Sequence, residues 1–314
     1  MTRKILTLKS KRQKVSLPVD EAINDPYHDD PQKRFLNGVA INPYECIQLE
    51  LGSQHLSTRA IDLLTPIGMG QRGLIVAPPG SGKTTMLKHI CQAVGKAYPE
   101  IKLYALLIDE RPEEVTDFKR SVPAQVHASS TDENYDQHVR VANNLLNIAR
   151  QEAGEGHNVM IVIDSLTRLT RVHNAHRKSS GRTLSGGIDA NAMEIPRKLF
   201  GAARKIENGG SITILATILV DTGSRMDQVI FEEFKGTGNM DIVLSREAAN
   251  QQIYPALDIA KSSTRREELI LNSKDIENVR AVRRALTSLK PVEGARKLVE
   301  LLEQYPTNAE LLHH

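Results

Sequence analysis

Short apolar runs alternate with segments of helical periodicity from Gly73 onward. Apolar residues recur at helical spacing over 84–98 and 137–151, and Pro112 opens a further helix, where its missing N–H costs nothing. The expected strands are 73–77, 103–108, 159–163 and 211–220. Strands that alternate with helices form a parallel sheet covered on both faces. The pattern therefore predicts an α/β fold.

The alternation does not reach either end of the chain. Residues 1–33 are polar and charged, which predicts a flexible tail. Residues 34–72 indicate short strands and turns, a lead-in layer before the core at 73–271. Residues 272–314 are mainly helical in pattern, with helices expected over 276–289 and 292–303.

Composition adds few constraints. A chain of 314 residues buries enough apolar surface to fold without disulfides or a structural metal. Cys46 and Cys91 lie far apart, outside any zinc-binding spacing, and are expected to be reduced thiols of a cytoplasmic protein. No apolar stretch is long enough for a signal peptide or a membrane span. The net charge of +3 neither requires nor excludes a nucleic-acid partner.

The strongest chemical signal lies between the first expected strand and the helix after it. Residues 77–84 (APPGSGKT) match the P-loop pattern, except that Ala77 replaces its first glycine. Such a loop turns backbone N–H groups toward phosphates, and the helix N-terminus adds its dipole. Lys83 would contact the β- and γ-phosphates, and the Thr84 hydroxyl would bind Mg²⁺. The predicted nucleotide-binding residues are Pro79, Gly80, Ser81, Gly82, Lys83, Thr84 and Thr85, with ATP as ligand. A chance glycine-rich turn is the alternative, and the flanking strand and helix argue against it.

Two acidic residues at strand ends are candidates for catalysis. Asp164 closes the apolar run 159–164, where a P-loop protein holds its magnesium; the alternative is a cap for the next helix. Glu110 follows Asp109 at the end of the neighbouring strand, and we predict that it positions the attacking water, with Asp109 as the second candidate. A solvated acidic turn is the alternative for this pair. The predicted metal ligands are Thr84 and Asp164.

Four longer segments carry a family resemblance: 106–115 (LLIDERPEEV), 186–190 (GGIDA), 221–224 (DTGS) and 232–239 (EEFKGTGN). They resemble the motor domain of the bacterial transcription terminator Rho, and the resemblance spans 61–271. It implies a RecA-like P-loop ATPase that uses ATP and Mg²⁺. It also implies a homo-hexameric ring, with RNA moved through the central channel as by a helicase. RNA polymerase is the further partner that transcription termination would involve.

The resemblance assigns roles to residues that spacing alone leaves open. Arg111 and Arg168 match residues that tie the catalytic pocket together. Arg265 matches the family's arginine finger, which the adjacent subunit supplies to stabilise charge on the γ-phosphoryl group; on its own it would be read as a surface charge. Tyr254 matches the aromatic residue that stacks on adenine, with a packed core ring as the alternative. Gly80 stands where the family often has lysine.

Two segments match the family's channel loops. The first, 177–187 (RKSSGRTLSGG), is basic and rich in glycine and hydroxyl groups, which suits contact with a phosphate backbone. Arg182 and Thr183 are its expected RNA contacts, and Arg225 is that of the second, 221–225. Either loop alone could be a solvated turn. The choice of RNA over DNA rests on the resemblance.

The resemblance does not extend to the N-terminal RNA-binding domain of the Rho family. The residues before Ile61 carry no OB-like strand pattern with stacking aromatics. This leaves a second hypothesis, a Rho-derived ring ATPase or oligomeric interaction protein without termination activity. A third is a related RecA-like motor, such as a rotary ATP synthase or secretion ATPase. The segments 221–224 and 232–239 favour Rho over this third hypothesis.

Overall fold

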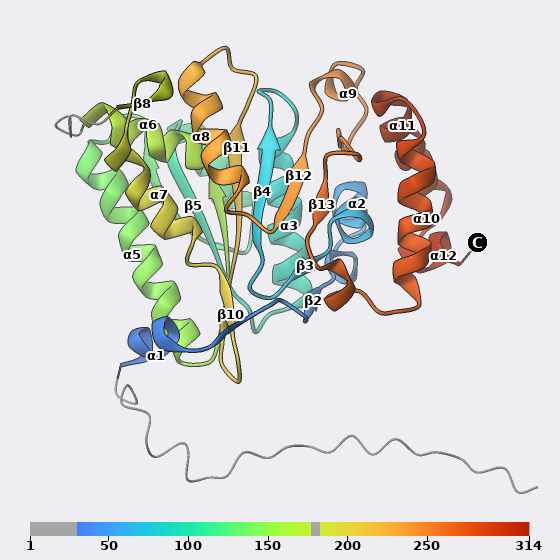
Figure 1. Ribbon diagram of the computed structural model, residues 1–314, viewed down its shortest axis with the longest axis horizontal. Coiled ribbons are helices and arrows are strands. Elements are labelled where there is room, and N and C mark those ends of the chain that lie inside the picture. Colours follow the sequence, from blue (N-terminus) through green and yellow to red (C-terminus); the bar gives the residue numbers. More distant parts are fainter. Residues whose placement is uncertain (1–29, 177–182, 314) are drawn as a thin grey trace, which may run out of the picture.

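A mostly parallel sheet forms the centre of the protein (Figure 1). The computed structural model describes residues 30–176 and 183–313. The strands along the sheet run β13-β12-β4-β11-β7-β5-β6, and β10 and β1 extend it antiparallel from β11. Pairing from β12 to β6 is parallel, and β13 is an antiparallel edge strand. The predicted α/β class and parallel sheet are confirmed.

The strands of the main sheet are β1 Ala40–Ile41, β4 Arg72–Ala77, β5 Lys102–Glu110, β6 Gln125–Ser130, β7 Asn158–Asp164, β10 Arg204–Ile206, β11 Ser211–Leu219, β12 Met240–Val243 and β13 Ser263–Thr264. Two small hairpin sheets pair β2 (Cys46–Ile47) with β3 (Ile67–Gly68) and β8 (Thr183–Leu184) with β9 (Ile188–Asp189). The four predicted strands correspond to β4, β5, β7 and β11. The strands β6, β10, β12 and β13 lie outside the predicted set.

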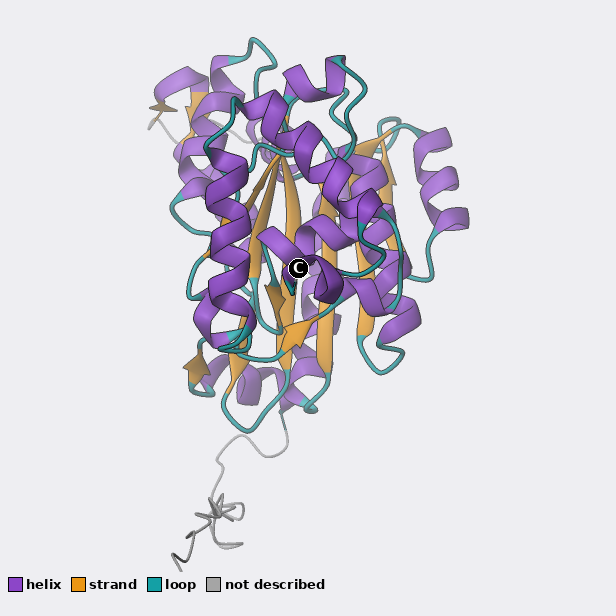
Figure 2. Ribbon diagram, turned by 90° about the vertical axis from the view of Figure 1, so that its right-hand side faces the viewer, coloured by secondary structure: helices purple, strands orange, loops and turns teal. Residues whose placement is uncertain are grey.

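Helices cover both faces of the sheet (Figure 2). They are α1 Pro31–Asn37, α2 Leu56–Leu64, α3 Lys83–Ala97, α4 Pro112–Ser121, α5 Tyr135–Gly154, α6 Leu166–His176, α7 Glu194–Phe200, α8 Arg225–Lys235, α9 Arg246–Asn250, α10 Asp275–Thr287, α11 Pro291–Gln304 and α12 Asn308–Leu312. Residues of α1, α5, α6, α7 and α8 pack on one face, and those of α2, α3, α4, α10, α11 and α12 pack on the other.

Strand β4 is buried because helices cover both faces of the sheet around it. Leu74 and Val76 join the hydrophobic cluster on the α5 side, whereas Ile75 and Ala77 join the cluster on the α3 side. All four are at least 96% buried, because successive side chains of a strand point to opposite faces and both faces carry helices. A continuous apolar run is the sequence signature of this arrangement.

The lead-in layer differs from the prediction. Residues 34–72 contain the helix α2, where only short strands and turns were expected, and α1 begins at Pro31, inside the predicted tail. Helix α2 buries Ala60, Ile61 and Leu64 on one side, at helical spacing. Its nine residues make a periodic pattern too short to distinguish from a strand in the sequence alone. Residues 1–29 of the predicted tail lie outside the described residues.

Parallel pairing fixes where the site lies. The strands β4, β5, β7 and β11 all end at one edge of the sheet, the upper edge in Figure 1. Groups that follow these strands are therefore neighbours, although they are far apart in the sequence. Within the described residues, no helix is long and apolar enough to cross a membrane.

Candidate functional site

The P-loop connects the end of β4 to the start of α3. Gly80 (φ +76°) and Gly82 (φ +89°) adopt the left-handed conformation, which any side chain would strain. The Ser81 hydroxyl donates a hydrogen bond to the carbonyl of Pro78 (2.7 Å) and closes the turn. Helix α3 then begins at Lys83, so its N-terminal N–H groups point toward the space in front of the loop. This is the geometry of an anion-binding loop.

Lys83 lies at the centre of the candidate site. Its Nζ donates to both carboxylate oxygens of Asp164, at 2.7 and 2.6 Å, and lies 3.8 Å from Oε1 of Glu110. The Thr84 hydroxyl is 3.3 Å from Oδ2 of Asp164. Thr217 of β11 donates to Oδ1 of Asp164 at 2.8 Å and fixes the carboxylate. Four predicted residues from three separate segments are thus brought together.

The oxygen donors suit the predicted magnesium ion. Thr84 supplies a hydroxyl and Asp164 a carboxylate, and Mg²⁺ prefers oxygen ligands, few of them from the protein. A cavity of about 590 Å³ lies in front of Lys83 and Thr84, with room for phosphates and water. The residues therefore fit the ion.

The surroundings of Glu110 shift the pKa of its carboxyl group. Its side chain is 3% exposed, and neither carboxylate oxygen has a hydrogen-bond partner in the described structure. Burial and the neighbouring Asp164 carboxylate raise the pKa of Glu110 to about 8, against the opposing effect of Lys83 and Arg168. The Arg168 Nη2 lies 3.2 Å from Oε2 of Glu110. A buried carboxyl without a hydrogen bond can accept one from a bound water.

Two of the predicted arginines line the cavity in different ways. Arg168 donates to the backbone carbonyl of Asp109, which holds the strand end next to Glu110. Arg111 is exposed, and its Nη1 lies 3.4 Å from Glu114. Both line the cavity in front of Lys83. Pro79 and Thr85 line the same cavity, as predicted for nucleotide contacts.

A second cavity of about 470 Å³ opens on the other side of the loop. Tyr254 lines it and is 42% exposed, so the alternative of a packed core ring is wrong. The ring lies close to the loop, 3.5 Å from where a Cβ on Gly82 would sit. His55 and His89 line the same cavity with their rings stacked, 3.7 Å between centroids. No local signal in the sequence connects these two histidines, because only packing of α2 against α3 joins them.

The predicted channel loops meet at the same edge of the sheet. Arg225 is exposed at the start of α8, and a Cβ on Gly186 would lie 2.9 Å from its carbonyl oxygen. Thr183 lies in β8, paired with Asp189. Arg182 lies outside the described residues. The two segments are therefore neighbours, although the 33 residues 188–220 separate them in the sequence.

An ion pair between Arg171 and the buried Asp227 connects the cavity to the second loop. Arg171 of α6 lines the cavity and donates through Nε to Oδ1 of Asp227 at 2.8 Å. Thr222 lines the same cavity, and its hydroxyl donates to Oδ2 of Asp227 at 2.5 Å. Asp227 is 1% exposed, so its charge depends on these partners. This link between the cavity and the loop 221–225 is absent from the predicted site.

Arg265 stands apart from the other predicted catalytic residues. It is exposed just after the edge strand β13, and its N–H donates to the carbonyl of Asn239. The Asn239 side chain accepts from the N–H of Arg72, the first residue of β4. Arg265 therefore lies at the amino-terminal edge of the sheet, with the length of β4 between it and the P-loop. An arginine side chain does not bridge that length, so Arg265 does not complete the cavity of its own chain.

Comparisons with known proteins agree with this geometry. Residues 57–264 match the ATP synthase alpha/beta family, nucleotide-binding domain. The chain is 48% identical, over 86% of its length, to the transcription termination factor Rho of Streptobacillus moniliformis. It is 44% identical, over 94% of its length, to that of Haemophilus influenzae, and covers 71% of that protein. The chain belongs to the Rho family.

The Rho-family relatives are longer than this chain. It spans 65% of the Streptobacillus protein and 58% of the Rhodopirellula baltica one, to which it is 46% identical. Among solved structures, an ATPase of the type III secretion system of pathogenic bacteria aligns with a TM-score of 0.72 at 24% identity, over 88% of this chain and 85% of that one. That likeness shows the RecA-like fold that Rho shares with secretion ATPases.

Proposed function

We propose that this chain is the ATP-hydrolysing motor of a Rho-type RNA translocase and helicase. The observation that carries the proposal is the cluster of Lys83, Thr84, Asp164 and Glu110 beside the cavity of about 590 Å³ that Lys83 and Thr84 line, in a chain of the Rho family. Secretion ATPases share the fold but are less similar in sequence. The activity belongs in the cytoplasm, with RNA polymerase as the partner that termination involves.

The chain's own residues suggest how the reaction proceeds. Lys83 is paired with Asp164, and on ATP binding its ammonium group would exchange that carboxylate for β- and γ-phosphate oxygens. Magnesium, held by Thr84 and Asp164, would neutralise charge on the triphosphate. Glu110 would then hold the attacking water through a carboxylate that the fold leaves without another hydrogen bond.

We propose that the ring is a homo-hexamer and that neighbours share each site. Arg265 lies at the opposite edge of the sheet from its own P-loop, so it would serve the nucleotide of the next subunit. Arg225, with Arg182 and Thr183, would hold the RNA backbone in the channel. The ion pair between Arg171 and Asp227 would let a change in the nucleotide cavity reach the loop 221–225.

Phosphate release with and without poly(C) tests the proposed function. RNA should stimulate hydrolysis, and Arg225→Ala should remove the stimulation while leaving the basal rate. A rate that stays constant across RNA concentrations would contradict the RNA-translocase assignment. Detectable hydrolysis that RNA does not affect would favour the ring ATPase without termination activity.

A further inference from the structure

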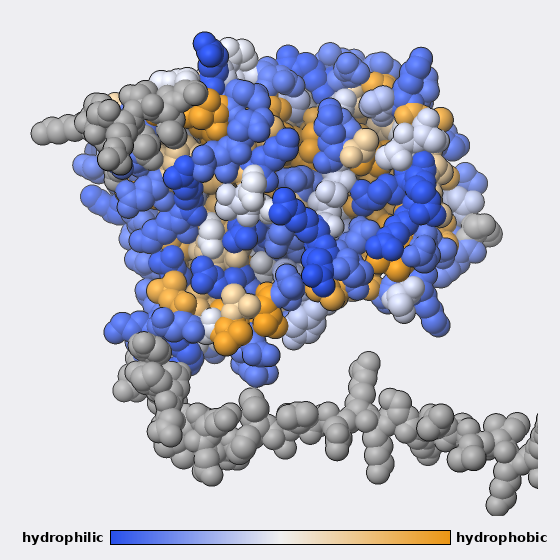
Figure 3. Space-filling view, viewed as in Figure 1, coloured by the Kyte–Doolittle hydropathy of each residue, from blue (hydrophilic) through white to orange (hydrophobic). Residues whose placement is uncertain are grey.

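The cavity of about 470 Å³ beside the P-loop has apolar walls. Leu56, Met86, Pro255 and Ala256 line it, together with the ring of Tyr254. Among the described residues that line it, none is an acid, a lysine or an arginine. Hydrophilic residues, by contrast, cover most of the face shown in Figure 3. This base cavity therefore suits a flat, uncharged group better than a phosphate.

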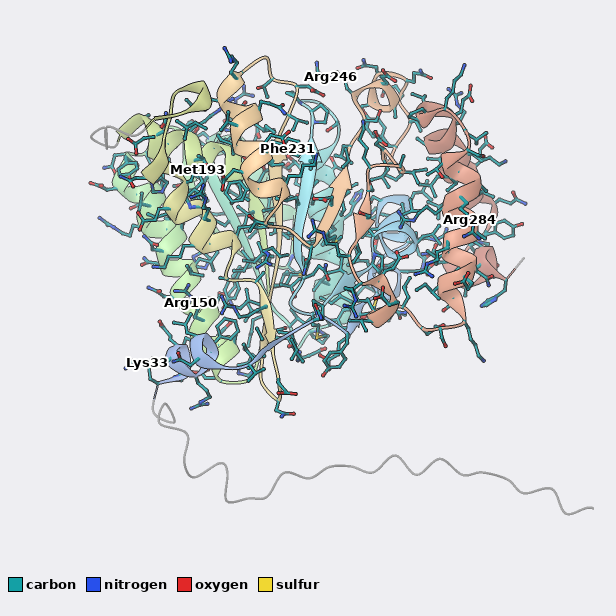
Figure 4. The ribbon with its side chains drawn as sticks, viewed as in Figure 1. Lys33, Arg150, Met193, Phe231, Arg246 and Arg284 are labelled. Atoms are coloured by element: carbon teal, nitrogen blue, oxygen red, sulfur yellow. The ribbon has the colours of Figure 1, made fainter. Side chains whose placement is uncertain are left out.

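The base cavity adjoins the cavity of the predicted phosphate site. Gly80, Gly82 and Thr85 line both cavities, so the two meet at the P-loop. Tyr254 lies at the same edge of the sheet, because it follows α9, whose first residue, Arg246, lies at the upper edge of the molecule in Figure 4. One nucleotide can thus place its phosphates in one cavity and its base in the other.

His89 lies on the side of α3 that lines the base cavity. It follows Met86 by three residues and Thr85 by four, a spacing that puts the three side chains on one side of the helix. At a rise of about 1.5 Å per residue, His89 is about 9 Å along the helix from Lys83, the predicted phosphate ligand. Ribose and a purine ring span such a length. His89 therefore stands where the far edge of a bound base would reach.

Two contacts hold the His89 ring. It stacks on His55, with 3.7 Å between the ring centroids and 10° between the ring planes. Its Nδ1 lies 2.8 Å from the hydroxyl of Ser57, a side chain that is 8% exposed. A buried hydroxyl donates its proton where an acceptor is in reach, and among the described residues Nδ1 of His89 is that acceptor. The ring proton of His89 then lies on Nε2, which is a hydrogen-bond donor.

The His89 ring is neutral at pH 7. Burial, and secondly the neighbouring His55, lower the pKa of His89. A neutral ring has one donor and one acceptor, so the hydrogen bond from Ser57 decides which nitrogen is the donor. The stack on His55 fixes the direction in which that donor points.

The far edge of a purine, opposite the ribose, distinguishes adenine from guanine. Adenine has the bare nitrogen N1 there, which accepts a hydrogen bond, whereas guanine has an N–H at the same position. An N–H of the protein that faces this position bonds to adenine but meets a second donor in guanine. A site built around one hydrogen bond rejects a ligand that leaves it unmade.

We propose that His89 determines the base specificity of the nucleotide site, with its Nε2–H donating a hydrogen bond to N1 of adenine. Ser57 and His55 are positioning residues, which fix the tautomer and the plane of the His89 ring. The inference rests on the proposed function in taking the P-loop as a nucleotide site, and it adds a residue that selects the base.

Binding of ATP and of 1-deaza-ATP, in which a C–H replaces N1, tests this role. We would measure both dissociation constants for the full chain by competition against a fluorescent ATP analogue. The unmodified chain should bind 1-deaza-ATP about two- to twelvefold more weakly, the change expected for the loss of one neutral hydrogen bond. His89→Phe keeps an aromatic ring but has no donor. It should bind ATP more weakly by a similar factor and should no longer distinguish the two nucleotides.

Two further variants separate the hydrogen bond from general effects of substitution. His157→Phe makes the same replacement at an exposed position just before β7, at the opposite edge of the sheet, and should leave both dissociation constants unchanged. Ser57→Ala should narrow the difference between the two nucleotides, because the His89 proton is then no longer held on Nε2. Thermal melting shows whether each variant is folded, and Ser57→Ala tests the same hydrogen bond if His89→Phe is not.

Three outcomes would contradict the role of His89. If the unmodified chain binds both nucleotides equally while Lys83→Ala weakens both, no donor reads N1, and the proposed function stands. If His89→Phe keeps the difference between the two nucleotides, the donor to N1 is another group. If the unmodified chain binds neither nucleotide, the proposed function fails together with this inference.

Discussion

Removing the Arg265 guanidinium should stop turnover without preventing ATP binding. The backbone of Arg265 lies beside Asn239 and Arg72, and β4 runs six residues from Arg72 to Ala77. At about 3.3 Å per residue this places Arg265 about 20 Å from the P-loop of its own chain. Arg265→Ala should therefore leave the cavity around Lys83 intact. A finger arginine contributes a factor of about 10³–10⁵ to kcat, which corresponds to about 4–7 kcal/mol.

Mixing two inactive variants gives the decisive assay. Arg265→Ala keeps the nucleotide site and lacks the finger, whereas Lys83→Ala lacks the nucleotide site and keeps the finger. In randomly mixed rings with equal amounts of both, about one interface in four pairs an intact Lys83 with an intact Arg265, since each interface is heterologous. Steady-state phosphate release from the mixture should thus recover toward a quarter of the unmodified rate. Arg266→Ala, which removes the neighbouring exposed arginine, is the matched control and should keep full activity.

Two results would refute this reasoning. If Arg265→Ala alone hydrolyses ATP at the unmodified rate, Arg265 is not a finger. If the mixture releases no more phosphate than the sum of the two variants while native mass spectrometry shows mixed rings, Arg265 does not act on the neighbouring subunit.

Three further predictions follow from the site and the core. Lys83→Ala should weaken ATP binding and reduce hydrolysis, because the phosphates lose their cation; near-unmodified turnover would exclude this role. The ATPase kcat/KM, which reports ionisation of the free enzyme, should rise with pH up to about 8, because Glu110 acts as a carboxylate and its pKa is raised to about 8. The same shift should reduce stability as pH rises from 4.5 to about 8, because over this range the unfolded chain has released a proton that the folded chain still holds, and the loss should level off above 8. A flat kcat/KM profile between pH 6 and 9, roughly the window around this pKa, would contradict the role of Glu110. Phe200→Ala should lower the free energy of unfolding by about 3–5 kcal/mol, measured by urea denaturation, because the fully buried ring packs edge-on against Phe234; a loss below about 1 kcal/mol would mean that the cavity collapses.

The sequence by itself determined the fold class and the local chemistry of the loop. Buried parallel strands require continuous apolar runs, and a phosphate loop requires glycines, a lysine and a hydroxyl at fixed spacing. The strands β4, β5 and β7 and the segment 77–84 can therefore be recognised in the sequence. The short helices and strands could not be predicted in this way. Helix α2 and strand β12 carry too few residues for their period to be distinctive, and packing against longer neighbours determines what they form.

Only the tertiary structure decided which distant residues share a site. Parallel pairing brings Thr217 to Asp164, and the packing of α2 on α3 stacks His55 on His89. The same pairing puts Arg265 at the far edge of the sheet, away from its own nucleotide cavity. These relations depend on strand order and on which edge each strand end reaches. A sequence records residue order and not strand order.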